Sequence, residues 1–129
     1  SVAKINVDSV ELSSAAMPPT YYFNSKKNNL EEILVPNLPL GGIQREKFDG
    51  IKLTFKKGDL IVMISDGLPE LPNPNEELLD YEKVEQCLKN NSKKDAEDIK
   101  DALVNLSDEW SNGKLNPDDI TIVVIKKAA

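Results

Sequence analysis

Apolar and polar residues alternate over short stretches in the first 55 residues, which is the pattern of strands with one buried face. The alternation predicts a hairpin formed by VAKINV and SVELSSA, then strands in TYYF, LEEILV and IKLTF. LEEILV also fits a helical turn, but Pro36 and Pro39 stop anything longer, so the strand is favoured. Asp49 and Gly50, just before IKLTF, are interpreted as a hairpin turn.

Two later stretches are apolar with almost no interruption. LIVMI occupies residues 60–64 and ITIVVI occupies residues 120–125. A strand of this kind is covered on both faces, so these two stretches are predicted to lie in the interior of the protein.

After residue 75 the apolar period changes to that of a helix. Amphipathic helices are predicted over 80–90, with Asp80 as N-cap, and over 95–110, with Asp95 as N-cap, and Gly113 is predicted to end the second. Their apolar stripes consist of Val84, Cys87 and Leu88, and of Ile99, Ala102, Leu103, Leu106 and Trp110. The layout predicts an α+β fold, with antiparallel β-sheets flanked by helices, in a single domain over residues 1–129.

Carboxylates stand at the ends of the two apolar strands. Asp66 follows the first strand, and Asp118 and Asp119 precede the second. If the strands are antiparallel neighbours, these carboxylates converge on one edge of the sheet, whereas parallel strands would hold them roughly 17–20 Å apart. We expect the antiparallel arrangement.

Converging carboxylates repel each other by about 4 kcal/mol at 4 Å near a protein surface, unless a cation lies between them. An all-oxygen site suits magnesium, manganese or calcium, and Gly67 would let the backbone approach such an ion. The alternative is that Ser65-Asp66-Gly67 and Pro117-Asp118-Asp119 are ordinary turns without a ligand.

Composition removes several classes of function. The chain of 129 residues has no histidine, which excludes a Ser-His-Asp triad and every imidazole metal site. A net charge of -6 argues against nucleic acid as a partner. No apolar run approaches the ~20 residues of a membrane span, no signal peptide is present and only one cysteine occurs, so a cytoplasmic location without direct membrane contact is expected.

Four segments carry a resemblance to a known family. SSAAMPPTYYF, LPLGG, FKKGDLIVMISDGLPEL and PDDITIVVIK follow one another as in the carboxy-terminal half of the metal-dependent protein phosphatases (PPM, type 2C group), in the bacterial branch that includes SpoIIE and RsbU. The resemblance covers nearly the whole chain, and GDLIVMISDG and DDIT are its most specific parts. It implies a β-sandwich with helices on the outside.

The resemblance also implies an activity and its site. Proteins of this family hydrolyse phosphoserine or phosphothreonine with a water that bridges two manganese or magnesium ions. By resemblance, Asp66 and Asp118 are ligands of the same ion, Gly67 supplies backbone near it, and Asp119 is an alternative ligand or lies just behind the ligands. No catalytic residue beyond the metal ligands is implied. The partner would be a phosphorylated regulatory protein.

Two departures from the family pattern affect this interpretation. Ala16 stands where relatives often have glycine before the two prolines, so a slightly different backbone is expected there. The upstream aspartates that bridge the two metals have no counterpart, and the chain begins at Ser1, so it is expected to be the carboxy-terminal part of a longer phosphatase domain and inactive alone. A truncated sheet would favour a homodimer through an exposed strand edge. The alternative is a non-catalytic partner-binding module with a degenerate phosphatase fold.

Overall fold

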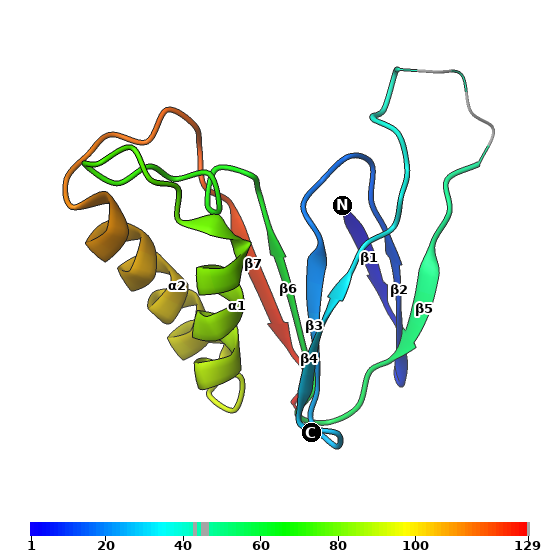
Figure 1. Cartoon of the computed structure of the whole chain (residues 1–129). Coiled ribbons are helices and arrows are strands. Elements are labelled where there is room, and N and C mark those ends of the chain that lie inside the picture. The colour runs from blue at the N-terminus through cyan, green and yellow to red at the C-terminus, as the bar shows by residue number, and fades with distance from the viewer. Residues whose placement is uncertain (43, 45–46, 129) are drawn as a thin grey trace.

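The fold is described by a computed structural model over residues 1–42, 44 and 47–128. Within these residues the chain forms seven strands and two helices (Figure 1). The strands are β1 (Val2–Ile5), β2 (Ser9–Ser13), β3 (Thr20–Asn24), β4 (Asn29–Ile33), β5 (Ile51–Thr54), β6 (Leu60–Ile64) and β7 (Ile122–Lys126), and the helices are α1 (Asp80–Asn91) and α2 (Ala96–Ser111).

The elements stack in three layers. One sheet has the strand order β4-β3-β6-β7 and the other has the order β1-β2-β5, with all neighbouring strands antiparallel. Both helices lie on one face of the four-stranded sheet, and the three-stranded sheet lies on its other face (Figure 1). This arrangement confirms the predicted α+β fold.

β6 shows why an uninterrupted apolar strand was needed. Leu60, Val62 and Ile64 face the helices and join the larger hydrophobic core. Ile61 points the other way, into the smaller core between the two sheets, where Met63 packs beside it. Since successive side chains of a strand point to opposite faces, a strand covered on both sides must be apolar throughout.

The turns and caps follow the sequence in part. The β1–β2 hairpin is confirmed. Asp95 is the N-cap of α2, because its side-chain oxygen accepts a hydrogen bond from the Asp98 amide at 2.9 Å. α2 ends at Ser111, where Asn112 takes the left-handed conformation just before Gly113, so the predicted stop is confirmed to within a residue.

Two local predictions are wrong. Asp80 does not cap α1 but is its first residue, and its carboxylate accepts a hydrogen bond from the next amide, that of Tyr81. Asp49 and Gly50 do not form a hairpin turn, because β5 pairs with β2 while β4 belongs to the other sheet. Asp49 instead exchanges two backbone hydrogen bonds with the side chain of Asn37, at 2.9 and 3.0 Å.

Ala16 adopts a backbone conformation that favours glycine. Its φ is 50°, in the left-handed region, and its amide donates to the carbonyl of Asn37 at 3.1 Å. A residue with a Cβ carries a cost of roughly 1–2 kcal/mol there. Alanine at this position, where the family resemblance implies glycine, is thus accommodated with strain.

No helix among the described residues is long and apolar enough to cross a membrane.

Asp59 is a buried acceptor that fixes two turns at one end of the sheets. Its side chain is only 2% exposed. Its carboxylate accepts from the amide and hydroxyl of Ser25, both at 2.8 Å, from the Lys56 amide at 2.8 Å and from the Tyr22 hydroxyl at 3.3 Å. The β3–β4 and β5–β6 turns therefore share one anchor.

We expect Asp59→Asn to destabilise the chain by about 2 kcal/mol, because the new amide turns a donor toward buried donors that then lack an acceptor. Urea unfolding of the chain checks this value. Asp8→Asn is the matched control: Asp8 is exposed, its ion pair is with exposed Lys56, and solvent screens that pair, so its loss should cost far less than the loss of Asp59. Equal losses in the two variants would contradict the anchoring role.

Candidate metal centre

The pairing of β6 with β7 brings the predicted site residues to one edge. The two strands are antiparallel, with Leu60 opposite Lys126 and Ile64 opposite Ile122. The end of β6 therefore lies beside the start of β7, and the segments carrying Asp66 and Asp118 emerge from the same end of the sheet (Figure 1, top). The antiparallel pairing predicted from the sequence is confirmed.

Ser65 extends the contact beyond the strands. Its amide donates to the carbonyl of Thr121 at 3.0 Å, and its hydroxyl donates to the carbonyl of Asp119 at 3.1 Å while it accepts from the Thr121 amide at 2.9 Å. These three hydrogen bonds fix the backbone on both sides of the candidate ligands. Ser65 is not among the residues predicted for the site, although a polar residue between an apolar strand and an aspartate was the available signal.

Gly67 lies directly against the segment that precedes β7. A Cβ built on Gly67 would lie 2.3 Å from the carbonyl oxygen of Asp119 and 3.0 Å from its carbonyl carbon, so only glycine fits. The side-chain amide of Asn116 donates to the Gly67 carbonyl at 3.2 Å and closes the contact from the other side. Asn116 is a second positioning residue that was not predicted from the sequence.

The carboxylates at this edge face solvent. Asp66, Asp118 and Asp119 are all exposed. One oxygen of Asp118 accepts from the amide of Asp119 at 2.7 Å, which orients the Asp118 side chain. Hard carboxylate oxygens at a rigid strand end suit a magnesium or manganese ion.

The donor set is nevertheless small. The described part of the chain has no group of three or more histidine, cysteine, aspartate or glutamate side chains that could hold a metal ion. Magnesium takes six oxygen ligands, some of them water. The residues present therefore fit part of such a site, in donor chemistry but not in number.

The negative charge at this edge affects a neighbouring tyrosine. Burial raises the pKa of the Tyr81 hydroxyl, and the nearby carboxylates of Glu70 and Asp66 raise it further. The same electrostatic potential attracts cations.

A shallow hollow of about 220 Å³ lies beside the candidate centre. Ser65 and Thr121 line it together with Met17, which comes from the Met17-Pro18-Pro19 segment. The segment that contains Met17-Pro18-Pro19 thus lies next to the two segments with the most specific family motifs, GDLIVMISDG and DDIT.

Comparison with known proteins identifies related sequences. The protein-family description "Stage II sporulation protein E (SpoIIE)" matches residues 2–128. The chain is 28% identical over 130 residues to the phosphoserine phosphatase RsbU of Bacillus subtilis (strain 168), an alignment that covers 97% of this chain and 37% of RsbU.

Solved structures share the fold. The SiaA-PP2C domain of Pseudomonas aeruginosa superposes with a TM-score of 0.78 at 16% identity, over 93% of this chain and 46% of that one. The phosphatase domain of SpoIIE from Bacillus subtilis, in its manganese-presoaked form, gives 0.72 at 20% identity, over 98% of this chain and 55% of that one. The chain thus spans little more than a third of its curated relative and about half of each structural one.

Proposed function

Because this chain belongs to the stage II sporulation protein E (SpoIIE) family, we propose that it forms the carboxy-terminal part of a metal-dependent protein serine/threonine phosphatase domain. The observation that carries the proposal is the pairing of β6 with β7, which brings the Asp66 segment against Asp118 and Asp119 on one edge of the sheet. The similarity to a phosphoserine phosphatase supports the reaction class.

In this proposal Asp66 and Asp118 bind the same divalent ion, manganese or magnesium. The presoaked relative supports manganese. A bound ion of this kind lowers the pKa of a water molecule and neutralises phosphoryl oxygens, which allows hydrolysis in a chain without histidine. Asp119 acts as an alternative ligand or holds the Asp118 side chain in place through its amide.

The positioning of these ligands depends on their neighbours. Ser65 ties the end of β6 to the start of β7, and Asn116 ties the Gly67 carbonyl to the segment before β7. Substrate binding therefore meets carboxylates whose backbone is already fixed, which reduces the reorganisation needed at the site.

An upstream part of the parent domain would supply the remaining ligands. These ligands would also hold the second ion of the complete site. The described residues provide too few carboxylates for a whole centre, so the 129-residue chain alone is proposed to be inactive. The same shortage is the observation that favours the alternative, a non-catalytic partner-binding module. Upstream aspartates in the parent sequence would support the enzyme, and their absence would support the module.

The proposed substrate is a phosphorylated regulatory protein. A cytoplasmic location stays a prediction, and so does a homodimer that forms through an exposed strand edge. The outer strands of the two sheets are β4 and β7, and β1 and β5, so a dimer would use one of these edges.

Metal removal tests the proposed function. The parent protein, stripped with a chelator, should release no phosphate from a phosphoserine peptide, and adding manganese or magnesium should restore hydrolysis, because the ion supplies the activated water. The 129-residue chain under the same conditions is the control and should stay inactive. Hydrolysis that persists after complete metal removal would overturn the proposal.

A further inference from the structure

Lysine side chains gather at the end of the molecule opposite to the candidate metal centre. β6 begins there, where β3 and β7 end, since Leu60 pairs with both Phe23 and Lys126. The β3–β4, β5–β6 and α1–α2 connections lie at this same end (Figure 1, bottom). We call it the basic end; it carries nine of the 16 lysines and arginines of the chain, namely Lys26, Lys27, Lys56, Lys57, Lys89, Lys93, Lys94, Lys126 and Lys127.

Hydrogen bonds between these connections make the basic end a rigid surface. The Ser25 hydroxyl donates to the Lys57 carbonyl at 3.0 Å, and the Gly58 amide donates to the Lys127 carbonyl at 2.9 Å. The ammonium of Lys126 donates to the Ser92 carbonyl and ties β7 to the α1–α2 connection. Four segments that are distant in the sequence are thereby held together.

Few carboxylates at this end neutralise the lysines. Asp8 pairs with Lys56 at 2.8 Å, and Glu85 pairs with Lys89 at 2.7 Å. Asp59 is buried and bonded to donors of the β3–β4 and β5–β6 turns. Among the residues that the structure describes, the other seven lysines form no salt bridge with a carboxylate. A chain with a net charge of -6 thus has one strongly positive surface.

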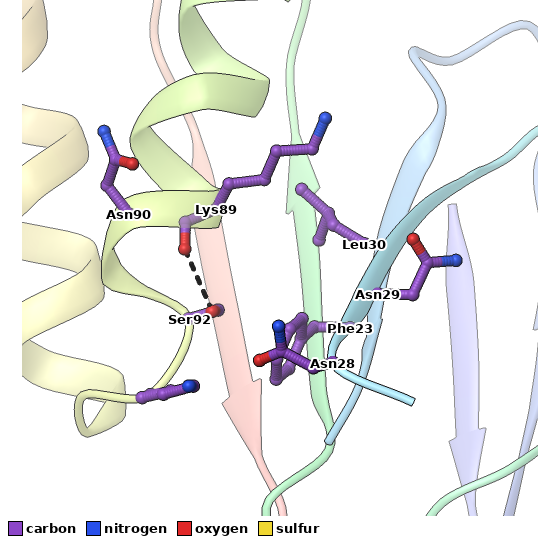
Figure 2. A pocket seen from close by; sticks show the side chains of 8 residues that line it. Phe23, Asn28, Asn29, Leu30, Lys89, Asn90 and Ser92 are labelled. Carbon is purple, nitrogen blue, oxygen red and sulfur yellow. Dashed lines mark hydrogen bonds between the residues drawn. The ribbon is translucent and has the colours of Figure 1, made fainter. Parts of the chain in front are cut away.

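Two adjoining hollows open on the basic end. The first, of about 400 Å³, lies between the end of α1 and the start of β4, with Asn28, Asn29, Asn90 and Lys89 around the buried Phe23 (Figure 2). The second, of about 440 Å³, is bordered by five lysines and one carboxylate, that of Asp95, which accepts a hydrogen bond from the Asp98 amide at 2.9 Å; the lysines are Lys57, Lys93, Lys94, Lys126 and Lys127. Lys93 lines both hollows, so they form one continuous surface.

We propose that this pair of hollows is a docking surface for an acidic segment of a partner polypeptide. Ammonium and amide groups donate hydrogen bonds to carboxylates, and lysine, as a flexible point charge, suits an acidic segment without fixed geometry. Within the part of the chain that the structure describes, no exposed large hydrophobic side chain lines either hollow, so a membrane would be held there by charge alone. The concave shape favours inserted side chains over a flat bilayer.

The docking surface is separate from the candidate metal centre. The five residues of β6 span the distance between them, about 14 Å. A partner held at the basic end therefore leaves the carboxylate edge open, and the inference does not depend on the proposed phosphatase chemistry.

Charge reversal with a matched control tests the docking surface. The triple variant Lys57→Glu, Lys93→Glu, Lys94→Glu changes the second hollow, and Lys4→Glu, Lys47→Glu, Lys52→Glu changes net charge equally at exposed positions elsewhere. Binding of a fluorescein-labelled oligoglutamate peptide to the 129-residue chain is followed by anisotropy at about 50 mM salt, where screening is weak. We expect the basic-end variant to bind at least about tenfold more weakly, and the control variant to bind like the unmodified chain within about twofold.

Other outcomes would overturn the inference. Equal weakening in both triple variants would mean that net charge alone attracts the peptide. No binding by the unmodified chain, combined with sedimentation on phosphatidylserine vesicles, would identify a membrane surface instead. If circular dichroism shows that the glutamate variant is unfolded, glutamine at the same three positions takes its place and should still weaken binding about threefold.

In the parent protein, hydrolysis of a short phosphopeptide should be unchanged by either triple variant, so this test and the test of the proposed function fail independently.

Discussion

Replacing Asp66 with alanine in the parent phosphatase should lower kcat/KM by at least on the order of a hundredfold, because the metal-dependent stabilisation of the transition state is worth several kcal/mol. Asp66 is exposed and caps no helix, so its loss should leave the thermal unfolding midpoint of the chain nearly unchanged. Hydrolysis of a phosphoserine peptide, measured across a manganese titration, gives both the lost rate and the weakened affinity for the metal.

A double-mutant cycle shows whether the two aspartates share one ion. If Asp66 and Asp118 bind the same metal, Asp66→Ala and Asp118→Ala should each raise the manganese concentration for half-activation, and the double variant should lose little more than either single one. Asp8→Ala is the matched control, since Asp8 is an exposed aspartate that pairs with Lys56 at the opposite end of the sheets. Activity of Asp66→Ala within about twofold of the unmodified parent would remove Asp66 from the metal site.

The parts of the fold that follow from the sequence are those governed by one local pattern. The uninterrupted apolar run of β6 required cover on both faces, and the helices and the second sheet supply it. The N-cap at Asp95 depended on a side chain and an amide three residues apart, which a sequence displays directly. The antiparallel pairing of β6 with β7 followed from requiring that carboxylates at both strand ends serve one site.

The parts that the sequence did not predict depend on which segments meet in space. Asp49 and Gly50 have the composition of a hairpin turn, but the assignment of β4 and β5 to different sheets is decided by packing. Asp59 is buried and accepts hydrogen bonds from four donors of Tyr22, Ser25 and Lys56, and the two donor residues before position 26 are distant from it in the sequence. The basic end consists of lysines between positions 26 and 127, and only the topology gathers them.

The candidate site shows the same division. Asp66 and Asp118 were selected from their positions at the strand ends and from family resemblance, and their edge is the expected one. Their role as metal ligands stays a prediction. Ser65 and Asn116 were missed because their partners lie 49 to 56 residues away, and the polar residue at the end of an apolar strand, the one local signal for Ser65, does not show which residues it contacts.

Gly67→Ala should have the largest effect on stability among the glycine-to-alanine substitutions, about 3 kcal/mol or more, because the new Cβ meets backbone rather than a movable side chain. Gly67 has no positive φ, so alanine can adopt its conformation and the cost comes from crowding against Asp119 alone. Relief of the contact requires that the segment before β7 move, which weakens the hydrogen bonds of Ser65 and displaces Asp118.

Gly113→Ala separates crowding from backbone conformation. Gly113 has a φ of 82° and nothing within 4 Å of a built Cβ, so this control should lose only about 1 kcal/mol, through conformation alone. Urea unfolding of the 129-residue chain measures both losses, and in the parent protein Gly67→Ala should also reduce phosphatase activity while Gly113→Ala should not. A Gly67→Ala chain as stable as Gly113→Ala would show that the Asp118–Asp119 segment yields easily, and the rigid edge on which the candidate centre depends would then be disproved.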